Sequence, residues 1–122
     1  MSKKILVIDD EPEIAQVLKF RLEKNGYQAL VSHDGKEGLE KIRNENPDLI
    51  ICDVMMPFIN GFQLCRTLKD DAVLKRIPII LLTAKTTQSD QFWGKEAGAD
   101  EYVTKPYNAE ELLEKVKKFL TP

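Results

Sequence analysis

Short, continuous apolar runs alternate with longer amphipathic stretches along this chain. The runs predict strands at residues 5–8, 29–31, 49–52, 79–82 and 102–103. Strands that are apolar at nearly every position, rather than at every second one, are typical of a parallel sheet covered on both faces. The pattern therefore predicts an α/β domain.

The stretches between the runs carry apolar residues at helical spacing. Pro12 suits the first turn of a first helix and Gly26 its end. Five strand–helix units in strict alternation imply a doubly wound parallel sheet with right-handed crossovers. The second helix is predicted to be capped by Asp34 and to end at Asn46-Pro47, the fourth to cover residues 89–97, and the fifth to begin at Asn108. The predicted core-facing residues are Ile14, Val17, Leu18 and Leu22 in the first helix; Leu39 and Ile42 in the second; Phe62, Leu64, Cys65 and Leu68 in the third; and Leu112, Leu113, Val116, Phe119 and Leu120 in the fifth.

Length and composition narrow the classes of function. The 122 residues suit one domain spanning 1–122. The net charge of −2 is too small to indicate a partner, but the lack of a basic stripe speaks against direct nucleic-acid binding. Neither a secretory signal nor a segment long enough to span a membrane is expected. Cys52 and Cys65 lack metal-type spacing, so we expect reduced core thiols in a cytoplasmic protein, with a disulfide between them as the alternative.

Polar residues follow four of the predicted strands. Asp9 and Asp10 end the first run, Asp53 the third, Thr83 the fourth and Lys105 the fifth. The carboxyl ends of parallel strands share one edge of the sheet, which is where open α/β sheets bind ligands. Clustered carboxylates favour a hard cation such as Mg²⁺, and a carboxylate can attack phosphorus to give an aspartyl phosphate. Each residue alone has an ordinary explanation, such as capping or solvation, but their joint placement predicts a phosphoryl-transfer site.

The same residues resemble those of a known family. Over essentially its whole length the chain resembles the receiver domain of bacterial two-component response regulators. The matching segments are ILVIDDEP at 5–12, PDLIICDVMMP at 47–57, Gly61, PIILLTA at 78–84 and AGADEYVTKPY at 97–107. The resemblance implies a flavodoxin-like, five-stranded parallel sheet of order 2-1-3-4-5 with five helices.

The resemblance also implies roles for individual residues. Asp53 corresponds to the phosphoacceptor. Asp9 and Asp10 correspond to the acidic pair that holds Mg²⁺ together with Asp53 and the backbone carbonyl of Met55. Thr83 and Lys105 correspond to the residues that contact the phosphoryl group, and Tyr102 to an aromatic switch that follows Thr83. A cis peptide bond is implied between Lys105 and Pro106.

Some positions affect details of this resemblance. Asn60 stands where the family usually has Asp; because Asn also tolerates a tight turn, we expect little effect. Tyr107 replaces a common Phe. Met55 and Lys85 occupy positions that influence loss of the phosphoryl group, and the apolar Met55 side chain, which cannot orient water, predicts slow hydrolysis. Trp93 is expected to point outward, either as a partner anchor or packed against its neighbours.

The implied function is a signalling switch rather than a turnover enzyme. A histidine kinase or phosphotransfer protein is the expected donor, and an output domain or effector protein the expected downstream partner. A homodimer through the fourth helix, fifth strand and fifth helix is a further possibility. The alternatives are a Mg²⁺-dependent phosphatase, a flavodoxin-like electron carrier and a receiver-like interaction module that is never phosphorylated. A phosphatase of this kind would have a second Asp at the position where this chain has Met55. An electron carrier would need a phosphate-binding loop where this chain has Asp9-Asp10-Glu11.

Overall fold

The fold is a single parallel sheet with helices on both faces. The structure, a computed structural model, describes residues 2–83 and 95–121. Its strands run in the order β2-β1-β3-β4-β5, and every neighbouring pair is parallel. They are β1 (Lys4–Ile8), β2 (Gln28–Ser32), β3 (Leu49–Asp53), β4 (Ile79–Thr83) and β5 (Glu101–Thr104). This confirms the predicted flavodoxin-like class and its strand order.

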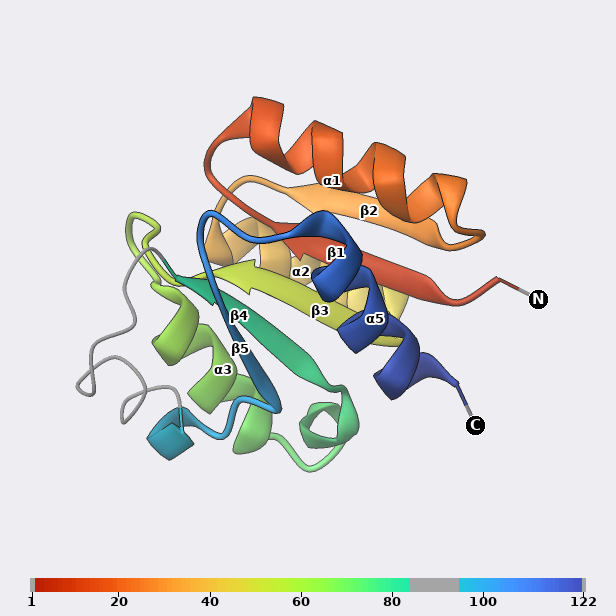
Figure 1. Cartoon of the computed structure of the whole chain (residues 1–122). Coiled ribbons are helices and arrows are strands. Elements are labelled where there is room, and N and C mark those ends of the chain that lie inside the picture. Colours follow the sequence, from red (N-terminus) through yellow and green to blue (C-terminus); the bar gives the residue numbers. More distant parts are fainter. Residues whose placement is uncertain (1, 84–94, 122) are drawn as a thin grey trace.

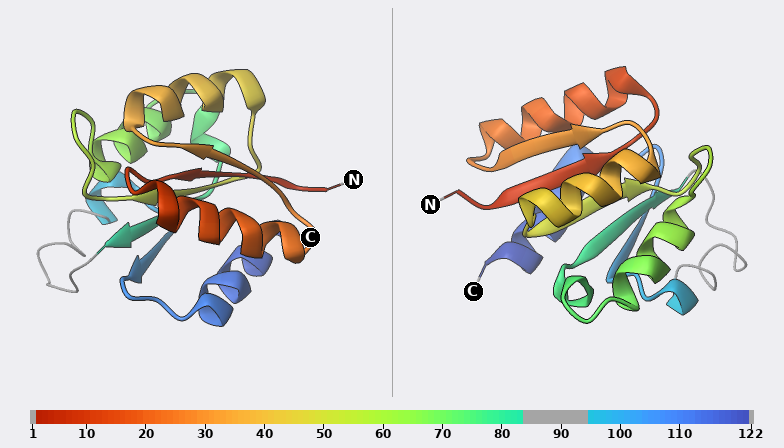
Figure 2. Two further views of the ribbon diagram at one scale, coloured as in Figure 1. Left: turned by 90° about the horizontal axis from the view of Figure 1, so that it is seen from above. Right: turned by 180° about the vertical axis from the view of Figure 1, so that it is seen from behind.

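In the described part of the chain, two pairs of helices cover the two faces of the sheet (Figures 1 and 2). One face carries α1 (Pro12–Lys24) and α5 (Ala109–Leu120), and the other carries α2 (Gly35–Glu45) and α3 (Gly61–Lys69). A short 3-10 helix, η1 (Leu74–Arg76), leads into β4. The fourth helix predicted at 89–97 lies mostly outside the described residues; residues 95–97 of it are described and are helical.

The central strands are buried because both of their faces pack against helices. In β1, Leu6 and Ile8 belong to the core on the α2 and α3 side, whereas Ile5 and Val7 belong to the core on the α1 and α5 side. All four are at most 1% exposed. Burying one such side chain stabilises the fold by about 1.5–3 kcal/mol, so the continuous apolar run in the sequence reflects two cores that share one sheet.

Local polar residues set where the helices begin and end. Asp34 accepts a 2.8 Å hydrogen bond from the Glu37 amide at the start of α2, as predicted. Asn46 ends the same helix in a left-handed conformation, with φ +47°. At the start of α5, Asn108 accepts hydrogen bonds from two amides of the first turn. The Asn108 cap fixes the end of the loop that carries Lys105.

The prediction that Val17 faces the core was wrong. Val17 of α1 is 58% exposed, and Ala15 occupies the buried face together with Leu18 and Leu22. Ala15, Leu18 and Leu22 follow the spacing of three and four residues that keeps side chains on one side of a helix, and Val17 falls off that side.

Both cysteines are free and buried, so the predicted thiols are present and the alternative disulfide is not formed. Among the described helices, none has the length and apolar character needed to cross a bilayer.

Candidate functional site

Three carboxylates meet at the carboxyl edge of the sheet. The turn after β1 supplies Asp9 and Asp10, and β3 ends at Asp53. The loops after β1, β3 and β5 lie at the same end of the sheet (Figure 1). One ligand atom from each of the three residues lies within 4.8 Å of the others. Side chains distant in the sequence therefore form one acidic cluster.

Asp9 is held rigidly within this cluster. It is only 1% exposed, and its Oδ1 accepts a 2.9 Å hydrogen bond from the Glu11 amide. Its own amide donates to the Ser32 carbonyl at the end of β2. Asp10, by contrast, is exposed. Asp9 therefore has a fixed orientation, whereas Asp10 presents its carboxylate to solvent, where a hydrated ion can reach it.

Lys105 bridges two of the carboxylates. Its Nζ lies 3.3 Å from Oδ2 of Asp9 and 3.5 Å from Oδ2 of Asp53. Burial lowers the pKa of the ammonium, but the charges of Asp53 and then Asp9 outweigh burial, so the pKa is raised. Lys105 consequently stays protonated and supplies a positive charge beside Asp53. The Lys105-Pro106 peptide bond is cis.

Asp53 is a buried carboxylate with a raised pKa. It is 6% exposed, and burial is the largest cause of the upward shift. Lys105 opposes this shift, and the nearby charge of Asp9 adds to it. The Met55 amide lies 3.4 Å from Oδ1, at the long end of a hydrogen bond. The ionised Asp53 carboxylate is therefore repelled by Asp9 and attracted by Lys105. Further positive charge nearby would favour this ionised form.

The other predicted residues in the described part of the chain lie on β4, on β5 and in the loop after β3. Thr83 ends β4 and is 3% exposed. Tyr102 of β5 is partly buried against the core on the α2 and α3 side. Met55 projects its side chain into solvent, 72% exposed. Lys85 and Trp93 lie outside the described part of the chain.

Two contributors were not predicted from the sequence. The Glu11 amide orients Asp9, and a backbone donor leaves no signature in residue type. The half-buried ring of Tyr107 lies near the site: burial raises the pKa of its hydroxyl, and the charge of Lys105 opposes this shift. The departure from Phe at this position was visible in the sequence, but its proximity to Lys105 was not.

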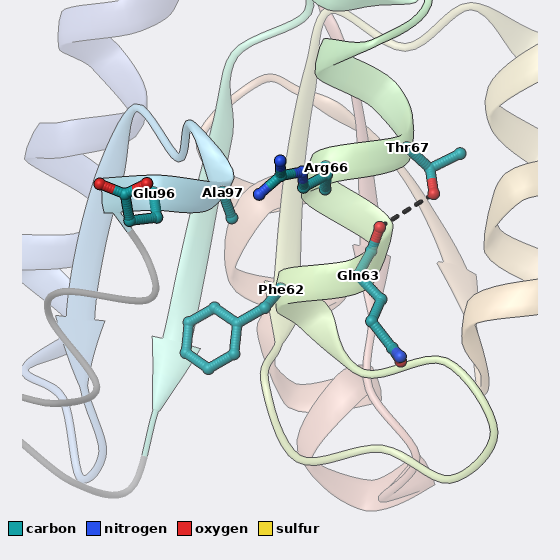
Figure 3. A pocket seen from close by; sticks show the side chains of 6 residues that line it. All are labelled: Phe62, Gln63, Arg66, Thr67, Glu96 and Ala97. Carbon is teal, nitrogen blue, oxygen red and sulfur yellow. Dashed lines mark hydrogen bonds between the residues drawn. The ribbon is translucent and has the colours of Figure 1, made fainter.

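Two surface hollows lined by described residues differ in their relation to the predicted site. One, of about 490 Å³, is lined by Ile14, Lys105, Pro106 and Tyr107 and adjoins the acidic cluster through Lys105. The other, of about 370 Å³, lies between α3 and the helical residues 95–97. Figure 3 shows Phe62 and Arg66 extending toward Ala97 there, and Thr67 donating a hydrogen bond to the Gln63 carbonyl. None of the described residues that line this second hollow belongs to the predicted site.

The acidic cluster fits a divalent metal ion. Asp9, Asp10 and Asp53 offer oxygen ligands of the kind that Mg²⁺ prefers, close enough to one another to share an ion. Burial and the nearby charge of Asp9 raise the pKa of Asp53, and a bound cation would favour its ionised form. The donor set and its charge thus match a hard cation.

Comparison with known proteins identifies the family of the chain. The family model described as the response regulator receiver domain matches residues 5–117. The chain belongs to this family. It is 43% identical over 120 residues to the alkaline phosphatase synthesis transcriptional regulatory protein PhoP of Bacillus subtilis, an alignment that covers 98% of this chain and 49% of PhoP. The receiver domain therefore spans about half the length of this curated relative.

Solved structures match this receiver domain closely. The signal receiver domain of a signal transduction histidine kinase from Syntrophus aciditrophicus has a TM-score of 0.93 at 40% identity, covering 98% of this chain and 91% of that one. A putative response regulator from Chloroflexus aurantiacus has a TM-score of 0.94 at 35% identity, with all of both chains covered. Receiver domains are signalling domains of two-component systems and not turnover enzymes.

Proposed function

We propose that this receiver domain accepts a phosphoryl group on Asp53 from the phosphohistidine of a histidine kinase or phosphotransfer protein. The observation that carries the proposal is the position of Lys105, whose ammonium lies within 3.5 Å of Asp53 and 3.3 Å of Asp9. A positive charge fixed beside a buried carboxylate is suited to balance the charge of a transferring phosphoryl group. We take residues 1–122 as one such domain, since the two cores share a single sheet.

In the proposed reaction an Asp53 carboxylate oxygen forms a bond to phosphorus as the donor's phosphorus–nitrogen bond breaks. The imidazole leaves with the electron pair. Lys105 stays protonated and neutralises phosphoryl oxygens, and Asp9 holds Lys105 in place. Asp9, Asp10, Asp53 and the carbonyl of Met55 would hold Mg²⁺, which when bound supplies positive charge to the phosphoryl oxygens. Later hydrolysis returns Asp53 to its carboxylate.

Phosphorylation would then change the preferred partner of one face. We assign Thr83 to contact with the new phosphoryl group and Tyr102 to following that movement. The face we assign to this change is the one predicted from the sequence, formed by the fourth helix, β5 and α5, and its candidate partners are an output domain, an effector protein or a second copy of this chain. Such a change is a shift between two populations of one fold. The two free buried thiols support the cytoplasmic location expected from the sequence.

The test is covalent labelling with a small donor. The purified chain is incubated with acetyl phosphate and MgCl₂, and its intact mass is measured. We expect a gain of one phosphoryl group that requires Mg²⁺ and is lost in Asp53→Asn, while the matched variant Asp70→Asn, at the exposed end of α3, keeps it. Absence of any gain in the wild type would favour an interaction module that is never phosphorylated.

A further inference from the structure

A three-residue turn in the loop after β3 displays an aromatic side chain. The Ile59 amide donates a 2.8 Å hydrogen bond to the Pro57 carbonyl, and the residue between them, Phe58, has φ +68°. This closes a γ-turn of the rare, strained kind that has a positive φ at its centre. A bulky residue seldom adopts this conformation, which Gly or Asn tolerates more easily.

The strain in this turn is not relieved by burial of the ring. Phe58 is 93% exposed, so its side chain makes almost no contact with its own chain. The neighbouring Met55 is 72% exposed in the same loop. Strained residues that gain nothing from internal packing are typical of functional sites, and large exposed apolar side chains are typical of contact surfaces. The loop that follows Asp53 therefore carries two exposed apolar side chains, and one of them, Phe58, lies on a strained turn.

Both ends of this loop are fixed. The Gly61 amide donates a 2.9 Å hydrogen bond to the Val54 carbonyl, directly after Asp53. Asn60 accepts from the Gln63 amide, and the Gln63 side chain accepts from the Asn60 amide, which closes a capping box. The partly buried Ile59 packs against the core. Phe58 is thus presented from a firm base rather than from a loose loop.

We propose that Phe58, with Met55, is an anchor for the protein that donates the phosphoryl group. This inference rests on the proposed function. A donor protein must bring its phosphorylated side chain to bonding distance of Asp53, and doing so places its surface over the loop that follows β3. Exposed aromatic side chains beside a site are effective contact points because they bury a large apolar area with few rotatable bonds.

A donor fits this position better than a downstream partner does. The loop is tied to the end of β3 and to α3, whereas the face assigned above to the output partner includes β5 and α5. Small donors such as acetyl phosphate need no such contact. Phe58 should therefore separate transfer from a protein from transfer from a small molecule.

The test compares the two kinds of donor with Phe58→Gly. The protein donor is the autophosphorylated catalytic core of a histidine kinase. Among the kinases encoded in the same genome, the one that transfers its phosphoryl group fastest to the wild type is chosen. We expect Phe58→Gly to slow this transfer by about tenfold and to leave labelling by acetyl phosphate nearly unchanged. Phe58→Tyr, which keeps the ring, should restore the transfer. Val73→Ala is the matched control, because Val73 is 61% exposed at the opposite edge of the sheet, before η1.

Stability separates this role from a structural one. Because glycine adopts a positive φ without strain, Phe58→Gly should unfold at a temperature no lower than the wild type. Equal kinase transfer by Phe58→Gly and the wild type, with acetyl phosphate labelling intact, would overturn this inference alone. Failure of acetyl phosphate to label wild-type Asp53 would instead overturn the proposed function, and this inference with it.

Discussion

The ammonium of Lys105 lies 3.5 Å from Oδ2 of Asp53. This ion pair connects the end of β5 to the end of β3 across the intervening strand β4. The pair is largely shielded, with side chains 19% and 8% exposed. Solvent therefore screens the attraction less than it would on an open surface. The relationship connects the fold to the proposed chemistry, since it requires the parallel order β3-β4-β5.

Lys105→Met should slow labelling by acetyl phosphate by on the order of tenfold or more, because a preorganised charge beside the transferring group is lost. The rate is measured by intact mass at saturating Mg²⁺. Lys117→Met, an exposed residue on α5, serves as the control for loss of one positive charge. Equal rates in Lys105→Met and wild type would remove Lys105 from the proposed mechanism.

Asp53→Asn should make the metal-free protein more stable at pH 7. Burial raises the pKa of Asp53, so the contribution of this carboxyl to stability is fully present below its unfolded pKa of about 3.9 and is lost as pH rises through the folded pKa. Urea midpoints in EDTA should therefore be higher for Asp53→Asn at pH 7 and converge with the wild type toward pH 4. A lower midpoint for Asp53→Asn at pH 7 would mean that its attraction to Lys105 outweighs burial.

Gly61→Ala should destabilise the domain by about 1–3 kcal/mol and impair labelling. A Cβ at Gly61 would lie 2.8 Å from the Asp53 carbonyl oxygen and from the Val54 Cα, and neither backbone atom can move without displacing the acceptor. Gly38→Ala is a matched comparison, since its Cβ would instead meet the tip of the Ile8 side chain at 2.7 Å. Urea unfolding should show the larger loss for Gly61→Ala, and equal losses would contradict this account.

Met55→Asn should accelerate loss of the phosphoryl group from Asp53. The Met55 side chain is 72% exposed in the loop after β3, where a polar replacement could orient a water molecule and the thioether cannot. The measurement is the decay of labelled protein after removal of acetyl phosphate, followed by intact mass. Val73→Ala controls for a change at an exposed apolar residue elsewhere. Wild-type decay as fast as that of Met55→Asn would contradict the expected slow hydrolysis.

The sequence predicted the sheet and the cluster because both depend on strong, simple patterns. Strands apolar at nearly every position leave little choice of class, and the parallel arrangement then places Asp9, Asp53 and Lys105 at one edge. Val17 was misplaced because an alanine, Ala15, takes the buried position on α1, and alanine contributes little to an apolar pattern.

The turn after β3 illustrates a different difficulty. Asn60 is the residue whose type tolerates a left-handed backbone, yet its φ is −81° and it caps α3 instead. With Asn60 used as the cap and Gly61 held against Val54, the positive φ falls on Phe58. The choice is made by two anchors outside the turn, so the residues of the turn itself do not reveal it.

The two thiols should be unreactive in the folded protein. Burial raises the pKa of Cys65 to about 11 and that of Cys52 well above its usual value. At pH 8 only about one Cys65 in a thousand would be a thiolate, which is the reactive form, and burial also denies access to a reagent. Ellman's reagent should therefore report almost no free thiol until guanidinium unfolds the chain, when both cysteines react. Rapid reaction of a thiol under native conditions would mean that the core on the α2 and α3 side, to which Cys52 and Cys65 belong, opens far more often than its packing implies.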